Sequence, residues 1–245
     1  MASSLLVFKV PMLLAAMYAE FVALTPPNAT PSKEDATRGY DGRDIITRLS
    51  LTISRFAIAV GWLTHGCEIA AILAQEVPGV ADVVPAVFSP PFFWQDGPFV
   101  DELALDPMFL LGFALLAFGT AVRKTCYNTL GRHFTFQLAI LKEHKLVTWG
   151  PYSVVRHPSY SGVIAAFAGM VAMQLSPGSW LTVGGALHTP LGQAIIGGWV
   201  GWLMLLVFGF TRRVLIEDAV LRKEFGSQWD EWARRVPNTL IPYLW

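Results

Sequence analysis

The chain has 245 residues, 53% of them hydrophobic and only 15% charged, where ordinary soluble domains carry roughly 25% charged residues, so the composition disfavours a soluble protein. Its 18 basic and 18 acidic side chains give a formal net charge of zero, which predicts no global attraction to nucleic acid or to an anionic surface. The two cysteines, Cys67 and Cys126, form neither a CxxC pair nor a disulfide framework, so neither a metal site nor a redox site is expected.

The hydrophobicity pattern predicts an all-α protein, a polytopic transmembrane helical bundle of about five spans, because each span needs about 20 mostly apolar residues. The five stretches cover about 3–24, 51–75, 103–122, 158–175 and 191–211. Turn signals at 176–178 and 188–190 separate the last two spans and leave 180–187 as a short interfacial or re-entrant piece. After the fifth span, apolar residues spaced along one helical face predict a cytoplasmic amphipathic helix over 212–232.

Polar and small residues inside the spans predict how the helices pack. The second span carries Arg55, His65 and Glu68, which indicates a helix packed against protein on one face. We expect the last two to pair with each other or with Arg55, although a contact with substrate is the alternative. Small residues let helix backbones approach closely in lipid, so the fourth and fifth spans are predicted to pair as a hairpin. These residues are Gly162, Ala166 and Gly169, and Gly197, Gly198 and Gly201.

Basic residues predict the orientation in the membrane, because short cytoplasmic loops are enriched in lysine and arginine. The stretch 76–102 has no basic residue, whereas 123–156 and 212–235 hold six each. Both basic stretches are therefore predicted to face the cytoplasm. With five spans, the N-terminus then lies on the lumenal side.

The densest cluster of polar and aromatic residues is GPYSVVRHPSYSG, over 150–162. One interpretation is a helix start, because Pro158 suits a first helical turn and Arg156, His157 and Tyr160 suit a membrane interface. The order of the residues favours a second interpretation. The cluster resembles the G-x-Y-x-x-x-R-H-P-x-Y-x-G run of the isoprenylcysteine carboxyl methyltransferase family and its relatives among phospholipid methyltransferases, with every named position present.

Two further stretches resemble the same family in the same order. The tail match comprises Arg213, Glu217, Phe225-Gly226, Trp229, Val236-Pro237 and Ile241-Pro242, with Glu217-Asp218 where consecutive glutamates are usual. A weaker match comprises Leu130-Gly131, His133-Phe134, Gln137 and 144–147. The resemblance covers about 115 residues. It divides the chain into an N-terminal transmembrane region, 1–129, without a matched motif, and a methyltransferase catalytic region, 130–245.

The resemblance implies S-adenosylmethionine as the cofactor. The implied cofactor-binding residues are Gln137, His144, Lys145, Leu146, Val147, Tyr152, His157, Pro158, Ser159, Tyr160 and Glu217. Arg213 would bind the acceptor, and Arg213, Glu217 and Arg156 form the expected catalytic set. A sulfonium and an α-amino group need acidic or aromatic partners, and an α-carboxylate needs hydrogen-bond donors. Glu217 suits the first role and Arg156 or His157 the second, while a solvated ion pair between Arg213 and Glu217 is the alternative.

The implied reaction is methyl esterification of a C-terminal prenylcysteine on a protein that faces the cytosol, a step of CaaX processing. The implied location is the endoplasmic reticulum membrane, and the prenyl chain would enter from membrane lipid. A carboxylate acceptor needs no general base, and Arg213 can grip it without ever losing its charge. Two alternatives remain open. They are N-methylation of an aminophospholipid, which needs a base such as His157 or Glu217, and a non-catalytic membrane scaffold of the same fold.

Overall fold

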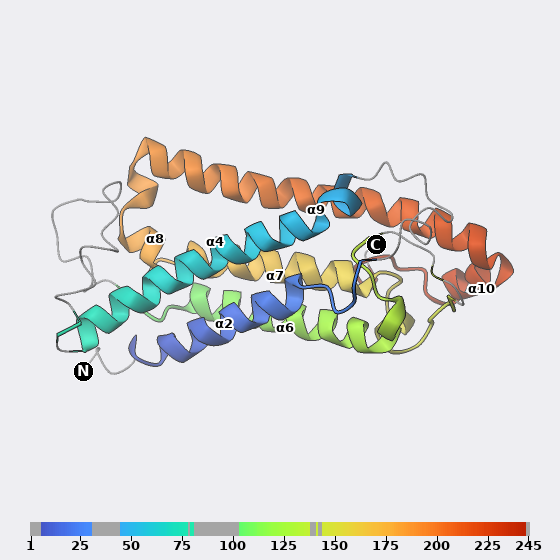
Figure 1. Cartoon of the computed structure of the whole chain (residues 1–245), viewed down its shortest axis with the longest axis horizontal. Helices are drawn as coiled ribbons and strands as arrows, with labels where there is room; N and C mark the ends of the chain where they lie inside the picture. The colour runs from blue at the N-terminus through green and yellow to red at the C-terminus, as the bar shows by residue number, and fades with distance from the viewer. Residues whose placement is uncertain are drawn as a thin grey trace. The chain divides into compact units, whose positions relative to one another are not determined.

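The computed structural model describes residues 6–30, 45–77, 79–80, 103–137, 141 and 144–243, and every regular element among them is helical. In chain order the α-helices are α2 (Lys9–Leu24), α4 (Ile45–Glu76), α6 (Pro107–Leu130), α7 (Pro158–Gln174), α8 (Trp180–Val183), α9 (Pro190–Phe225) and α10 (Ser227–Arg235) (Figure 1). Short 3₁₀ turns are η1 (Gly131–His133), η2 (Gly150–Ser153) and η3 (Ala186–His188). The predicted all-α class is confirmed for this part of the chain.

Three helical stretches are long and apolar enough to cross a membrane. They are Leu49–Glu76, Pro107–His133 and Pro190–Phe225. α2 has 16 residues and α7 has 17, which is short of the about 20 that a span usually needs. The three stretches are compatible with a multi-pass membrane protein, and the count of five spans stays a prediction.

The start of α6 shows how local capping sets a helix boundary. Asp106 Oδ1 accepts hydrogen bonds from the backbone N–H groups of Met108 (2.9 Å) and Phe109 (3.0 Å), so it caps a helix that begins at Pro107. Partial burial acts to raise the pKa of Asp106, but hydrogen bonds from the backbone outweigh it and hold that pKa below its usual value. The span predicted to begin at residue 103 therefore begins later as a helix.

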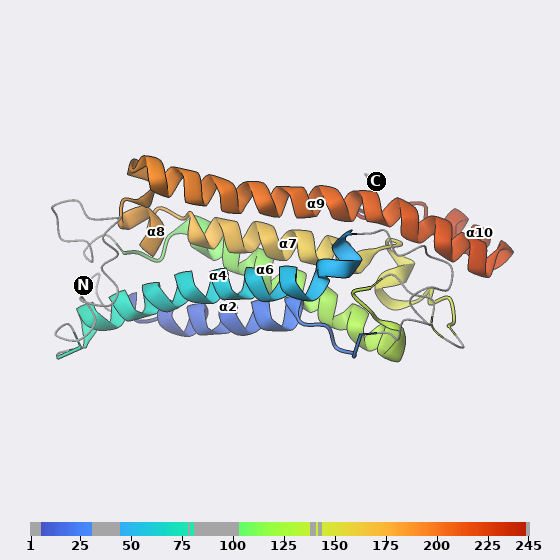
Figure 2. The same cartoon turned by 45° about the horizontal axis from the view of Figure 1, so that its top comes forward.

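The predicted boundary between a fifth span and a separate amphipathic helix, near residue 211, is wrong. α9 continues without a break to Phe225 and has 36 residues. It ends where Gly226 adopts a φ of 55°, a conformation that favours glycine, and the nine-residue α10 follows. Figures 1 and 2 show the long α9 and the short α10 after it. Arg213 and Glu217 therefore stand on the same helix as the last apolar stretch.

The chain forms two compact units. Unit 1 comprises Met1–Phe21, Ala57–Phe118 and Ala165–Met204, and unit 2 comprises Val22–Phe56, Gly119–Ile164 and Leu205–Trp245. In unit 1, α6 and α7 approach most closely at two glycines. A Cβ on Gly112 would lie 2.8 Å from the carbonyl oxygen of Gly169, and a Cβ on Gly169 would lie 2.5 Å from that of Gly112. Any larger residue would push these helices apart.

Three of the glycines of α9 in unit 1 do not make such an approach. A Cβ on Gly197, Gly198 or Gly201 would meet no heavy atom within 4 Å in the part of the chain that the structure describes. The close packing of α7 on α9 predicted at these glycines is therefore wrong. A hydrogen bond from Trp199 Nε1 to Gln174 Oε1 (2.8 Å) joins the two helices instead.

Unit 1 also pairs the buried charges of α4 with α2. His65 Nε2 lies 3.0 Å from Glu20 Oε1, and Glu68 Oε1 lies 2.5 Å from Lys9 Nζ. The expectation that His65 and Glu68 pair with each other or with Arg55 is wrong, and Arg55 is exposed. The physical reason lies in α2. Lys9 and Glu20 are eleven residues apart, which is three helical turns, so both face the same side of their helix.

Lys9 binds more than one partner in unit 1. Its Nζ donates hydrogen bonds to the carbonyl oxygens of Ala104 (2.7 Å) and Gly178 (2.8 Å), and it lies 4.5 Å from the ring centre of Phe109. Glu68 Oε2 in turn accepts from the backbone N–H of Trp180 (3.3 Å). This buried group of polar contacts fixes the turn that follows α7.

Unit 2 is built around a buried hydrophobic cluster. Its members are Cys126, Tyr127, Phe134, Val147, Tyr152, Trp232 and Val236. Trp232 is 2% exposed, and its indole Nε1 donates a hydrogen bond to the backbone carbonyl of Tyr152 (3.0 Å). A buried tryptophan keeps its N–H paired in this way. The cluster therefore ties α10 to η2, the first part of the 150–162 run.

Candidate active site

The 150–162 run forms a short turn, a bend and a helix start in unit 2. Gly150 adopts a φ of 63°, which favours glycine, and opens η2. Pro158 is the first residue of α7, as the helix-start interpretation predicts. Arg156 and His157 lie directly before this helix. Their backbone N–H groups are among those that α7 itself cannot pair.

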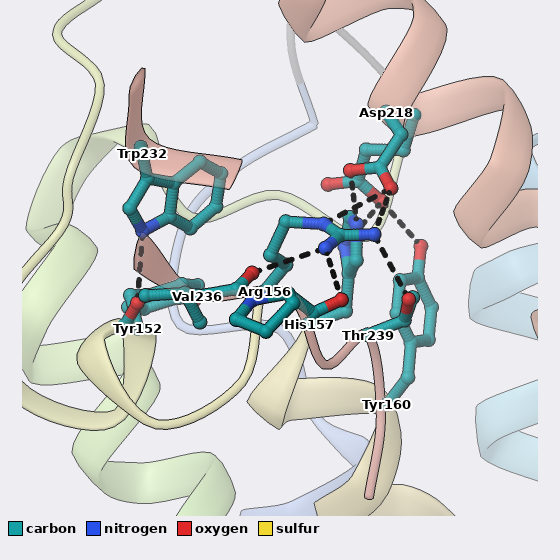
Figure 3. A network of polar contacts seen from close by, with 10 residues as sticks. Tyr152, Arg156, His157, Tyr160, Asp218, Trp232, Val236 and Thr239 are labelled. Carbon is teal, nitrogen blue, oxygen red and sulfur yellow. Dashed lines mark hydrogen bonds and ion pairs between the residues drawn. The ribbon is translucent and has the colours of Figure 1, made fainter. Parts of the chain in front are cut away.

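The C-terminal tail pairs with these free backbone groups. The N–H of Arg156 donates to the carbonyl oxygen of Asn238 (3.0 Å), and that of His157 donates to the carbonyl oxygen of Thr239 (2.9 Å). One turn later, Ser161 Oγ donates to the carbonyl oxygen of Leu240. Two matched motifs about 80 residues apart in sequence therefore lie in contact (Figure 3).

The side chain of Arg156 is held inside the protein by five hydrogen bonds. Nε and Nη2 donate to Asp218 Oδ2 at 3.2 and 3.1 Å, and Nη2 also donates to Thr239 Oγ1 at 2.9 Å. Nη1 donates to the carbonyl oxygens of Val236 (3.0 Å) and Pro237 (2.6 Å). A guanidinium has five N–H groups, so each of them has a partner. We call Arg156, Asp218, Thr239 and the carbonyls of Val236 and Pro237 the tail clasp.

His157 lies between two consecutive carboxylates of α9. Its Nε2 is 2.8 Å from Asp218 Oδ1, and its Nδ1 is 3.9 Å from Glu217 Oε2. Tyr160 donates a hydrogen bond from its hydroxyl to Glu217 Oε2 (2.9 Å), and its ring contacts that of Phe210 at 5.6 Å between centres. The Glu217 side chain is 28% exposed and that of Asp218 only 13%, so Glu217 is the carboxylate that a ligand can reach.

His144 and Tyr152 lie within the electrostatic range of the same carboxylate. Burial, followed by the charge of His133, lowers the pKa of His144 to about 4, while the charge of Glu217 opposes this shift. The His144 ring contacts the rings of His133 (4.9 Å) and Phe225 (5.8 Å). Burial raises the pKa of Tyr152 well above its usual value, and Glu217 is among the charges that add to the increase. Both side chains are therefore neutral at physiological pH.

Arg213 is buried one helical turn before Glu217. The residue is 4% exposed, and Nη2 donates to the backbone carbonyl of Phe136 (2.7 Å). A solvated ion pair with Glu217, the alternative reading of their four-residue spacing, does not fit such burial. The structure instead places a permanent cation inside unit 2.

The other expected cofactor residues divide into two groups. Leu146 and Val147 pack on the hydrophobic cluster next to Tyr152. Gln137 donates from Nε2 to Ser50 Oγ on α4 (3.1 Å), Ser159 accepts from Arg123, and Lys145 is exposed. The structure thus brings His157 and Tyr160 into contact with Glu217, and gives Gln137, Ser159 and Arg156 other partners in the unit.

Several residues of the N-terminal half and of α6 support this site although no motif marks them. Arg123 is 5% exposed, donates from Nη1 to Ser159 Oγ (3.1 Å) and from Nε to Tyr127 Oη (3.0 Å), and also contacts the carbonyl of Ala23. The i,i+4 spacing to Tyr127 is the sequence signal that finds it. Asn28 donates to the carbonyl oxygens of Gly131 and Phe134, both at 2.8 Å. The two contacts of Asn28 join residues more than 100 positions apart in sequence, so no local pattern reveals them.

Comparison with known proteins supports the resemblance that the motifs indicate. The sequence model of the isoprenylcysteine carboxyl methyltransferase family matches residues 110–187, which include the whole 150–162 run. The chain is 36% identical over 135 residues to protein-S-isoprenylcysteine O-methyltransferase B of Arabidopsis thaliana, a match that covers 54% of this chain and 58% of that protein. It is 31% identical over 136 residues to a probable protein-S-isoprenylcysteine O-methyltransferase of Oryza sativa subsp. indica, covering 55% and 61% of the two chains.

A third relative has a similar degree of identity. Protein-S-isoprenylcysteine O-methyltransferase of Dictyostelium discoideum is 30% identical over 147 residues, a match that covers 59% of this chain and 54% of that protein. The chain thus spans little more than half the length of the curated relatives it matches. The resemblance to the isoprenylcysteine carboxyl methyltransferase family that the motifs predict is confirmed.

Proposed function

We propose that this chain transfers a methyl group from S-adenosylmethionine to the C-terminal carboxylate of a prenylated cysteine on a protein, forming a methyl ester. The observation that carries the proposal is the meeting of His157 and Tyr160 at the accessible carboxylate of Glu217. The printed names of the relatives, which describe protein-S-isoprenylcysteine O-methyltransferases, support the same reaction.

The residues around Glu217 fit the chemical groups of this cofactor. When bound, S-adenosylmethionine supplies an electrophilic methyl group on a sulfonium cation. Glu217 attracts the cationic end of the cofactor. The hydroxyl of Tyr160 holds the carboxylate of Glu217 in place. Neutral aromatic rings at Tyr152 and Tyr160 suit a cation and a flat base, and Leu146 and Val147 add apolar surface.

Arg213 is the residue that we assign to the acceptor. A carboxylate is already a nucleophile at neutral pH, so the protein must orient it and exclude water without removing a proton. A guanidinium grips one or both carboxylate oxygens in a fixed plane and stays charged at every physiological pH. Burial strengthens this attraction, because the surroundings of Arg213 screen charge less than water does.

The cellular setting is part of the proposal. A prenyl chain partitions into lipid, and the three apolar helical stretches suit a protein that meets it there. The excess of basic residues in 123–156 and 212–235 supports a site on the cytosolic side, where the proteins that carry the acceptor reside. By the family resemblance, we propose the endoplasmic reticulum as the membrane.

One assay tests the proposal directly. The full chain in lipid nanodiscs is mixed with methyl-labelled S-adenosylmethionine and either a farnesylated cysteine analogue or phosphatidylethanolamine. We expect the label to appear as a base-labile ester of the analogue. Label in the lipid headgroup would establish the N-methyltransferase alternative instead, and cofactor binding without label in either acceptor would contradict the proposed acceptor.

A further inference from the structure

Glu217 and Asp218 are neighbours in sequence, yet their carboxylates have different surroundings. Asp218 accepts hydrogen bonds on both oxygens. Oδ2 accepts from two nitrogens of Arg156, at 3.2 and 3.1 Å, and Oδ1 accepts from His157 Nε2 at 2.8 Å. Glu217 lies 3.9 Å from the opposite nitrogen of the His157 ring and is about twice as exposed. Figure 3 shows Asp218 within this network of polar contacts, and the greater exposure of Glu217 makes it the carboxylate that a ligand can reach.

The hydrogen bond to Asp218 fixes the ring of His157. A carboxylate accepts only from a protonated nitrogen, so the proton on Nε2 is held toward Oδ1 and the ring cannot flip without losing this bond. The other ring nitrogen, Nδ1, is then held toward Glu217. The same device, in which a second carboxylate orients a histidine that acts on a ligand, is common around metal sites.

Asp218 also connects this histidine with the C-terminal tail. The guanidinium of Arg156 bridges Asp218 to Thr239 and to two carbonyls of the tail, while the backbone of His157 pairs with that of Thr239. Arg156, Asp218 and Thr239 are half-buried or buried, so solvent screens their interactions only partly. Loss of the Asp218 charge would therefore affect the histidine and the tail together.

We propose that Asp218 is a positioning residue for the cofactor site. It sets the ring of His157, and through the tail clasp the segment 236–240, so that Glu217 and Tyr160 present a preformed acidic and aromatic surface. Asp218 does not itself touch the cofactor. On this assignment Arg156 acts within the tail clasp and not on the reacting groups. The inference rests on the proposed use of S-adenosylmethionine at Glu217.

The test compares three substitutions in the full chain in lipid nanodiscs. Asp218→Asn keeps the shape and removes the charge, while Asp218→Glu restores the charge with one more methylene group. Asp230→Asn is the matched control, because Asp230 also pairs with an arginine of α9, Arg222, at 2.8 Å, but both partners are much more exposed. The measurements are the Kd of S-adenosylhomocysteine, the separate KM values for cofactor and prenylcysteine analogue, and kcat.

We expect Asp218→Asn to weaken cofactor binding and raise the cofactor KM roughly tenfold, the effect of losing a charged hydrogen bond from a half-buried site. The acceptor KM should stay near its original value, since Arg213 is untouched. Asp218→Glu should recover most of the affinity, and Asp230→Asn should match the original protein. Unchanged cofactor affinity in Asp218→Asn, or a loss in kcat alone, would overturn the inference.

A second measurement separates positioning from folding. Hydrogen exchange should accelerate in Asp218→Asn at the backbone amides of Arg156 and His157, which pair with the tail, while the amides within α7 remain protected. If Asp218→Asn does not fold, Thr239→Val removes a single acceptor of the tail clasp and should show the same pattern with a smaller change. If Thr239→Val then bound the cofactor as tightly as the original protein does, the inference would be overturned.

Failure of the proposed function gives a different result. A chain that binds S-adenosylhomocysteine but methylates no prenylcysteine would contradict the acceptor, while the effect of Asp218→Asn on the Kd would still decide the role of Asp218. If the Asp218→Asn variant methylated the analogue as well as the original protein does, the positioning role of Asp218 would be contradicted and the proposed function would stand.

Discussion

The two units hold buried charges in different ways. In unit 1, Lys9 pairs with Glu68 and His65 pairs with Glu20, with side chains that are at most 4% exposed. In unit 2, the neighbouring carboxylates of α9 keep 13% and 28% of their surface exposed and share partners with one another. Closed pairs can join helices but leave no room for a ligand. An open, shared network can receive one, so we place chemistry in unit 2 and structural support in unit 1.

The largest expected effect would test the structural role of unit 1. Lys9→Met should lower the free energy of unfolding by about 3–5 kcal/mol, because it leaves the buried Glu68 carboxylate without its cation. The double variant Lys9→Met/Glu68→Leu should recover most of this loss. Thermal and denaturant unfolding in detergent micelles measures both. Losses that simply add in the double variant would show that the two residues do not act as a pair.

The next effect would test whether unit 2 divides its work between two residues of α9. Arg213→Ala should reduce kcat/KM for the prenylcysteine analogue about a hundredfold, the typical loss when a buried electrostatic contact to the reacting group is removed. Its cofactor affinity should change little. Glu217→Ala should do the reverse and weaken cofactor binding about tenfold. Arg212→Ala, at an exposed neighbour, is the control. Equal loss of cofactor binding in Arg213→Ala and Glu217→Ala would contradict this division.

A smaller effect concerns the pH dependence of unit 2. The pKa of His144 is about 4 in the folded protein, below the value of 6.5 for a free histidine, so the unfolded chain binds a proton that the folded chain does not. Stability should therefore fall as pH decreases from about 6.5 toward 4, by on the order of 1 kcal/mol after allowance for solvent screening. His144→Gln should flatten this part of the curve in unfolding measurements between pH 4 and 7. An unchanged slope would show that other groups dominate.

The smallest effect is expected at an ion pair outside both networks. Arg222 and Asp230 lie 2.8 Å apart, but their side chains are 64% and 39% exposed. Arg222→Gln should change the free energy of unfolding by less than about 0.5 kcal/mol, because water screens the attraction between two exposed charges. Unfolding in detergent checks this value. If Arg222→Gln lowered the free energy of unfolding as much as Lys9→Met does, buried and exposed ion pairs would not differ in their contribution to stability.

Features set by neighbours in sequence could be predicted. Pro158 begins α7 and Pro190 begins α9, as the local turn and helix signals indicate. The 150–162 run was also found by its own order of residues. The end of the last long helix could not be predicted. The charged residues that follow residue 211 indicate the end of an apolar span, but no residue before Gly226 interrupts the hydrogen bonds of the helix.

Features set by distant partners could not be predicted. His65 and Glu68 have suitable partners on their own helix, and only the folded chain shows that α2 supplies them. The different roles of Glu217 and Asp218 are equally hidden, since the two acids are adjacent and chemically alike. Their directions depend on Arg156, which lies about 60 residues earlier. Periodicity identifies which face a residue is on but not which other segment meets that face.

The segment 236–240 has a consequence for how related chains are compared. It contributes mainly peptide carbonyls to the region around Arg156 and His157, and only Thr239 adds a side-chain atom. Peptide oxygens are present whatever the side chain is. Asn238, whose side chain is not part of the buried cluster, could therefore change through evolution and keep the same bond. A search for recurring letters would find Val236 and Pro237, which belong to the tail match, and would pass over Asn238, whose carbonyl accepts from the backbone N–H of Arg156.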